Sequence, residues 1–194
     1  MATALSGGVK RYLQIALVLT SCVAPLCCAT LERLSLDDMI SKSTAIVRGK
    51  VTGSFVAVAA NTPVIYTHYT IQVSERFKGP AGNTVDVVVP GGVLNNVSQS
   101  WSGAPGFSTG DEYVFFLWTS RAGLTQVIGL TQGLFSVAHD DSTDPVATRS
   151  ASHELMLDRS TGQPVKDQPL VMHLSELRSR ISTTLAAPAQ AVGK

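Results

Sequence analysis

The sequence is poor in charge, in aromatic residues and in cysteine. Charged residues make up 15% of 194 positions, and 15 Lys and Arg nearly balance 14 Asp and Glu, giving a formal net charge of +1. This balance argues against nucleic acid as a partner, because no excess of cationic side chains is present to neutralise phosphates. With 44% hydrophobic residues the chain is too apolar to be disordered as a whole, and its length suits one domain.

The first 29 residues differ from the rest and have the pattern of an export signal. Lys10 and Arg11 are the only charged residues there, and they precede a short apolar run from Tyr12 to Thr20. A basic region followed by a brief apolar stretch is typical of a secretory signal peptide. A membrane-spanning helix is the alternative, but it needs about 20 consecutive apolar residues, and Pro25 would break the helix late.

Two processing sites are compatible with this segment. Small residues precede Thr30, which predicts a signal peptide over 1–29 with cleavage after Ala29. Alternatively, Leu19-Thr20-Ser21-Cys22 resembles a bacterial lipobox, in which Cys22 is lipidated and anchors the chain to a membrane surface. We therefore expect a secreted or periplasmic protein, or else one that is lipid-anchored to the cell envelope.

Cleavage after Ala29 would remove every cysteine of the chain. The mature protein would then have no disulfide, no thiolate nucleophile and no cysteine metal site. Its stability would depend on a hydrophobic core, which a chain of this length can form. The three cysteines are Cys22, Cys27 and Cys28.

The segment 30–140 has the hydrophobic pattern of a small β domain. A short helix is expected over 35–43, with Ser35 as N-cap and an apolar face that includes Met39. β-branched runs and alternating patterns then predict six strands. The expected strands are 45–58, 65–77, 84–89, 112–119, 125–129 and 134–138.

Three further segments follow different patterns. Residues 91–110 form the longest irregular stretch, rich in Gly, Ser and Asn, and 141–172 reads as a polar loose segment with one short element near 153–158. Apolar residues at helical spacing predict a C-terminal helix over 173–186. The Ala- and Pro-containing tail 187–194 is expected to be disordered.

Together these elements predict a mainly β fold. Five or six strands with turn signals, few helices and glycines inside the first strand indicate a small antiparallel barrel, with Gly49 and Gly53 marking bends. The strand 112–119 is apolar on both faces and should therefore be central.

The order of several short motifs is specific. They are Phe77-Lys78-Gly79, Pro90-Gly91-Gly92, Gly110-Asp111-Glu112-Tyr113 and the run from Gly129 to Phe135. From Leu36 to Ala138 the chain resembles a group of exported bacterial proteins of unknown function. These proteins are in turn similar to the netrin-like OB barrel of the tissue inhibitors of metalloproteinases. The resemblance implies an OB-type or netrin-like barrel.

The same resemblance suggests protease inhibition as one alternative function. The metalloproteinase inhibitors reach the zinc of their target through an N-terminal cysteine held by disulfides. A mature chain beginning at Thr30 lacks such a cysteine. The resemblance therefore supports a fold and gives little support to this inhibitory mechanism.

A second alternative is a serine hydrolase. Gly106-Phe107-Ser108-Thr109-Gly110 matches the pattern of a nucleophile elbow, which would make Ser108 the nucleophile. That mechanism requires a strand before the serine and a helix after it, whereas here a loop precedes Ser108 and a strand follows it. An ordinary glycine-rich loop explains the pattern better, so we expect no catalytic residue and no enzyme.

We also expect no metal site and no cofactor. His139-Asp140-Asp141 with Asp144 lacks the glycine and the distal glutamate of a calcium loop, and a solvated acidic turn is the simpler interpretation. The histidines are scattered and form no metal-binding pair of the usual spacing.

Trp101 and Phe107 are the candidate binding residues. Aromatic side chains on a long loop commonly anchor an interface, although these two rings can equally fold back and close the core. The expected function is an exported, non-catalytic binding module that uses the loop 91–110. Its partner would be an unknown protein or a polysaccharide.

Overall fold

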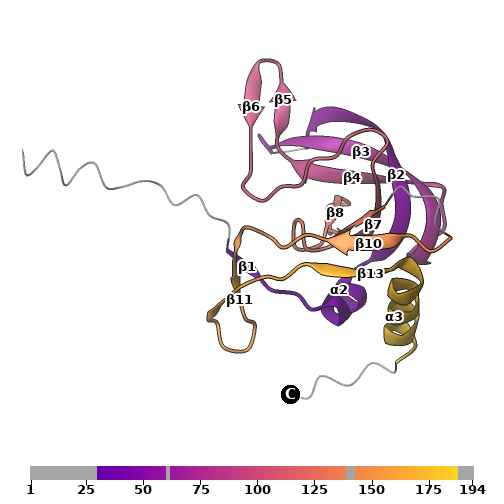
Figure 1. Cartoon of the computed structure of the whole chain (residues 1–194). Coiled ribbons are helices and arrows are strands. Elements are labelled where there is room, and N and C mark those ends of the chain that lie inside the picture. Colours follow the sequence, from indigo (N-terminus) through magenta and orange to yellow (C-terminus); the bar gives the residue numbers. More distant parts are fainter. Residues whose placement is uncertain (1–29, 60–61, 139–142, 188–194) are drawn as a thin grey trace, which may run out of the picture.

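The computed structural model describes residues 30–59, 62–138 and 143–187, and shows a mainly β fold with two helices (Figure 1). Its largest sheet has eight strands, and all their pairings are antiparallel. These strands are β2 (Ala45–Val58), β3 (Ile65–Lys78), β4 (Thr84–Pro90), β7 (Glu112–Thr119), β8 (Thr125–Val127), β9 (Leu134–Val137), β10 (Val146–Arg149) and β13 (Leu170–His173). Their order is β13-β10-β9-β7-β2-β3-β4, and β8 pairs with β7.

Two smaller sheets stand beside this one. β1 (Thr30–Glu32) runs parallel to β11 (Leu155–Leu157), which pairs on its other side with β12 (Pro164–Val165). The hairpin of β5 (Gly92–Leu94) and β6 (Val97–Gln99) projects from the body of the molecule (Figure 1). Its turn is formed by Asn95 and Asn96, which both adopt positive φ, as a tight hairpin turn requires.

The two helices pack on the same side of the large sheet. Helix α2 (Leu36–Lys42) begins at the predicted N-cap. Ser35 Oγ accepts a hydrogen bond from the Asp38 amide at 3.0 Å, and the Asp38 carboxylate accepts one from the Ser35 amide at 3.3 Å. Helix α3 (Leu174–Ala186) confirms the predicted C-terminal helix.

The sheet has a hydrophobic core on each face. One core lies under α2 and α3 and contains Met39, Ile46, Phe116 and Leu177. The other contains Val47, Val51, Ile71, Phe115 and Leu117, on the opposite face. Because neighbouring residues of β7 alternate between the two cores, this strand is central, as its pattern predicts.

The sheet bends at the glycines of β2. The register between β2 and β3 shifts at Gly49 and again before Gly53. At Gly49 a Cβ atom would lie 2.6 Å from the Gln72 carbonyl oxygen, so only glycine permits this approach of the two backbones. The bend brings β4 alongside β8, but the described strands form no hydrogen-bond ladder there, so the sheet is open.

Two expectations about irregular segments differ from the structure. Residues 91–110 contain the β5–β6 hairpin, and 141–172, expected to be loose, contains β10, β11, β12 and β13. These strands are two to four residues long, so no periodic pattern could develop in them. The pairing of β11 with β1 also joins segments that are far apart in sequence. The expected signal peptide 1–29 and the tail from 188 lie outside the described residues.

Candidate functional site

The two aromatic residues of the loop 91–110 occupy different environments. The Trp101 side chain is 53% exposed. Phe107 is partly buried and packs against the core inside the bend of the sheet. Its ring makes edge contacts with Tyr69, Tyr113 and Phe115, at centroid distances of 4.8, 5.5 and 5.7 Å. Trp101 is therefore available to a partner, whereas Phe107 anchors the loop to the core.

Ser108 lies in an exposed turn at the end of the loop 91–110, just before β7. The Asp111 carboxylate accepts hydrogen bonds from the Ser108 amide at 2.9 Å and from the Tyr113 hydroxyl at 3.3 Å. Within the described part of the chain, the Ser108 hydroxyl makes no hydrogen bond to a histidine. The nearest acidic group thus fixes the backbone of the turn, which is a structural role.

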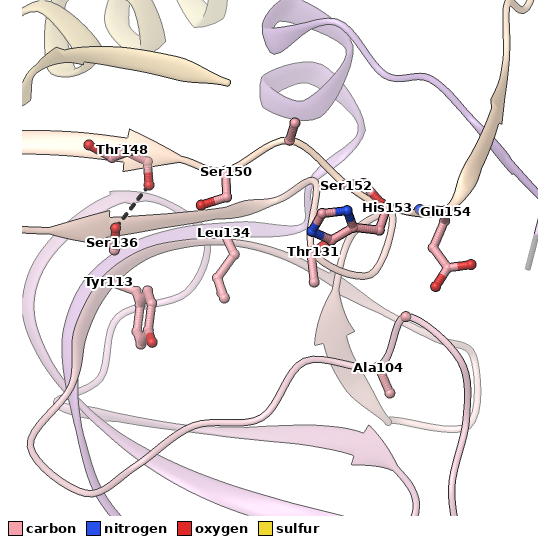
Figure 2. Close-up of a pocket in the computed structure, with 12 residues that line it drawn as sticks. Ala104, Tyr113, Thr131, Leu134, Ser136, Thr148, Ser150, Ser152, His153 and Glu154 are labelled. Carbon is pink, nitrogen blue, oxygen red and sulfur yellow. Dashed lines mark hydrogen bonds between the residues drawn. The ribbon is translucent and has the colours of Figure 1, made fainter. Parts of the chain in front are cut away.

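A hollow of about 340 Å³ lies between the loop 91–110 and the segment that follows β10 (Figure 2). Ala104 stands on one side, and Ser150 and His153 stand on the other. The volume is in the range of small-molecule sites. The full lining is Gly103, Ala104, Tyr113, Thr131, Leu134, Ser136, Thr148, Ser150, Ala151, Ser152, His153 and Glu154.

Three segments meet closely at one end of the hollow. Ser102 donates a hydrogen bond to Glu154 at 3.0 Å. A Cβ atom on Gly103 would lie 2.9 Å from both Glu154 and Leu130, and the φ of Gly103 is +75°. Leu130 itself has a φ of 59°, a conformation that costs a non-glycine residue about 1–2 kcal/mol. Close approach and backbone strain therefore coincide at this end.

A buried ion pair fixes the wall that carries Ser152. Arg149 binds the Asp167 carboxylate through two hydrogen bonds of 2.7 and 2.9 Å, and their side chains are only 5% and 1% exposed. The same carboxylate accepts the Ser152 amide at 2.8 Å. Burial acts to raise the pKa of Asp167, but the hydrogen bonds from Arg149 and Ser152 outweigh it and lower that pKa. The wall is thus attached to a charged pair that stays ionised.

The lining of the hollow is rich in hydroxyl groups and has no cationic residue of the Lys or Arg type. Burial raises the pKa of Tyr113, and the neighbouring Asp111 carboxylate raises it further, so the phenol remains a neutral donor. Ser136 donates to the Thr148 carbonyl at 3.0 Å. The hollow can therefore form many neutral hydrogen bonds, and few charged ones.

The remaining candidate features concern metal binding and membrane insertion. Across the three described ranges, no group of three His, Cys, Asp or Glu side chains could hold a metal ion. Asp144, one of the acidic residues considered for calcium, accepts hydrogen bonds from Ser175 at the start of α3. The others, His139, Asp140 and Asp141, lie outside the described residues. The lipidation candidate Cys22 also lies outside them. Neither helix of the described chain has the length and hydropathy to cross a bilayer.

No family model matches the chain, and no curated protein matches it in sequence. The candidate site therefore depends on its geometry alone.

Apart from the loop 91–110, the lining of the hollow carries no pattern that marks it as a site in the sequence. Thr148, Ser150 and His153 fall in the segment 141–172, which was expected to be loose. The polar residues that directly follow the β-like residues 146–148 are the sequence signal that could have indicated this wall of the hollow. Their proximity to Ala104 and Tyr113 depends on pairing between β9 and β10, which local pattern does not encode.

Proposed function

We propose that this chain is an exported, non-catalytic binding module, which holds a protein or polysaccharide at the loop 91–110 and the adjoining hollow. The observation that carries the proposal is the position of Trp101. Its indole is more than half exposed, and Gly103 and Ala104, which follow it closely, form one wall of the hollow. Trp101 itself does not line the hollow, but it belongs to the same loop, and an exposed tryptophan on a loop is a strong anchor for a partner.

Other residues of the loop 91–110 support the same role. Val93 and Val97 on the projecting hairpin are 65% and 54% exposed, so the loop presents several apolar side chains to solvent. Phe107 fixes the other end of the loop to the core. A loop anchored in this way loses less conformational entropy on binding than a free one.

The proposal includes the OB-type, netrin-like barrel and the export signal. The bend of β2 and the position of β4 alongside β8 support a partly closed barrel. The basic and apolar pattern of 1–29 supports export. An extracytoplasmic location suits a domain whose residues beyond 29 contain no cysteine to be oxidised.

Site-specific photocrosslinking in the cells that produce the protein tests the proposal. A photoreactive amino acid replaces Trp101 in the full chain, and a matched variant carries it in place of Trp118, a second exposed tryptophan on β7. We expect discrete adducts from position 101 and none from position 118. Equal adducts from both positions, or none from position 101, would contradict binding at this loop.

The mature N-terminus is tested on the same material. By mass spectrometry the protein should begin at Thr30, or at a lipidated Cys22 in the alternative form.

A further inference from the structure

We propose that the hollow binds an uncharged sugar residue of a glycan. This inference rests on the proposed function and assigns the chemical class of the ligand. The observations that support it are the hydrogen-bonding groups of the lining, its lack of Lys and Arg, and the way its walls are fixed.

The first argument is the supply of unused hydrogen-bonding groups. Thr131, Ser150 and His153 line the hollow, and within the described residues their side chains form no hydrogen bond with the rest of the chain. Figure 2 shows them grouped above the loop that carries Ala104. Each hydroxyl both donates and accepts, and a neutral imidazole does the same through its two nitrogens. A sugar, whose hydroxyl groups also donate and accept, matches this set.

The second argument is charge. A phosphate, sulfate or carboxylate ligand would find no Lys or Arg side chain in the lining, and it would lie near the Glu154 carboxylate. Placing an anion there without a cationic partner is unfavourable. Glu154 also accepts a hydrogen bond from Ser102, so it is already engaged and is a weak attractor for a cationic ligand. An uncharged, polar ligand meets neither difficulty.

The third argument is the combination of polar and apolar surface. Leu134, Ala104 and the ring of Tyr113 give the hollow an apolar part. A sugar ring has hydroxyl groups at its edge and C–H groups on its faces. It can therefore bind hydroxyl groups inside the hollow while its faces contact apolar and aromatic side chains.

The fourth argument is that the walls are held in place before a ligand arrives. The Arg149–Asp167 pair fixes the backbone of Ser152, and the close contact of Gly103 with Leu130 and Glu154 fixes the loop against the same segment. Such support lowers the entropy cost of binding a small, rigid ligand.

Isothermal titration calorimetry with purified protein tests this inference. The probes are soluble oligosaccharides in matched sets, namely neutral chitin and cationic chitosan oligosaccharides, and neutral galacto-, gluco- and manno-oligosaccharides beside anionic oligogalacturonate. We expect a neutral oligosaccharide to bind, and its affinity to exceed that of the charged probes by about tenfold or more. Failure of all neutral probes, or preference for a charged one, would overturn the inference.

Variants in the hollow give the second part of the test. Ser150→Trp fills the hollow with a bulky ring, and it should weaken binding by at least about tenfold. Ser54→Trp on β2 places the same ring on another exposed serine outside the lining, and it should leave the affinity unchanged. If Ser150→Trp does not fold, His153→Ala at the exposed rim replaces it, with the same expectation of weaker binding. Unchanged affinity in a folded hollow variant refutes the site.

The two proposals fail in different ways. If adducts form from position 101 in cells while no neutral oligosaccharide binds, the binding module stands and the sugar assignment falls. If oligosaccharides bind and Ser150→Trp prevents this, but position 101 gives no adduct, the hollow stands and the role of the exposed loop is wrong.

Discussion

At the scale of single residues, Trp101 and Phe107 should respond in opposite ways to truncation. Phe107→Ala removes a ring that contacts three aromatic residues of the core, so we expect a loss of about 2–4 kcal/mol in the free energy of unfolding. Trp101→Ala removes an exposed side chain and should change that free energy by less than about 0.5 kcal/mol. Urea denaturation of both variants measures the difference. Comparable destabilisation by the two substitutions would mean that Trp101 also belongs to the core.

The same pair of residues shows what a sequence can predict at this scale. Ser35 was predictable as a helix cap, because its partner Asp38 is three residues away and the motif is local. The burial of Phe107 depends on Tyr69 and Phe115, which belong to other strands. Two aromatic residues six positions apart in one loop therefore look alike in sequence and differ in the fold.

At the scale of elements, the β11–β12 hairpin should depend on the charge of Asp158. One oxygen of this carboxylate accepts hydrogen bonds from the hydroxyl and amide groups of Ser160 and Thr161. The Ser160 hydroxyl and the other donors lower the pKa of Asp158 from its usual 3.8 to about 2. Because the folded pKa is the lower one, the stabilisation is complete well above pH 3.8 and is lost as the pH falls through about 2.

Two substitutions at this position separate the charge from the geometry. Asp158→Ala should lower the midpoint of thermal unfolding at neutral pH, and its difference from the native chain should shrink as the pH falls toward 2. Asp158→Asn retains one acceptor oxygen but does not titrate. The difference in unfolding midpoint between Asp158→Asn and Asp158→Ala should therefore stay constant with pH. If that difference disappears on acidification, carboxylates other than Asp158 cause the pH dependence.

The elements that sequence patterns predicted are those with internal periodicity. The 14-residue strands β2 and β3, the apolar strand β7 and both helices were predicted nearly to their ends. The hairpin β5–β6 and the strands β10 to β13 were missed, because each is too short to show a period. The pairing of β11 with β1 also joins segments that are far apart in sequence. The hollow combines both kinds of element. Of its lining, only Gly103 and Ala104 belong to the loop that the sequence indicated for binding, and the predicted binding residues Trp101 and Phe107 do not line it.

At the scale of the whole molecule, the large sheet joins two cores. Each central strand contributes to both, since Ile46 and Val47 of β2, and Phe116 and Phe115 of β7, alternate between them. If one core came apart, one face of β2 and β7 would be exposed to solvent. The other core depends on the same two strands and would be destabilised too. The sequence indicated this arrangement through the doubly apolar pattern of β7, but it could not show how far the bent sheet closes, because that depends on how β4 approaches β8.

The shared sheet predicts a single cooperative unfolding transition. Leu177→Ala in the core under the helices and Leu117→Ala in the opposite core each delete a fully buried side chain, and each should cost about 2–5 kcal/mol. Circular dichroism at about 222 nm follows the helices, and near-ultraviolet circular dichroism follows aromatic packing such as that around Tyr69 and Tyr113. In both variants the two signals should shift together to the same lower midpoint. If Leu177→Ala moves only the helical signal, the two cores unfold independently, and the sheet between them does not couple them.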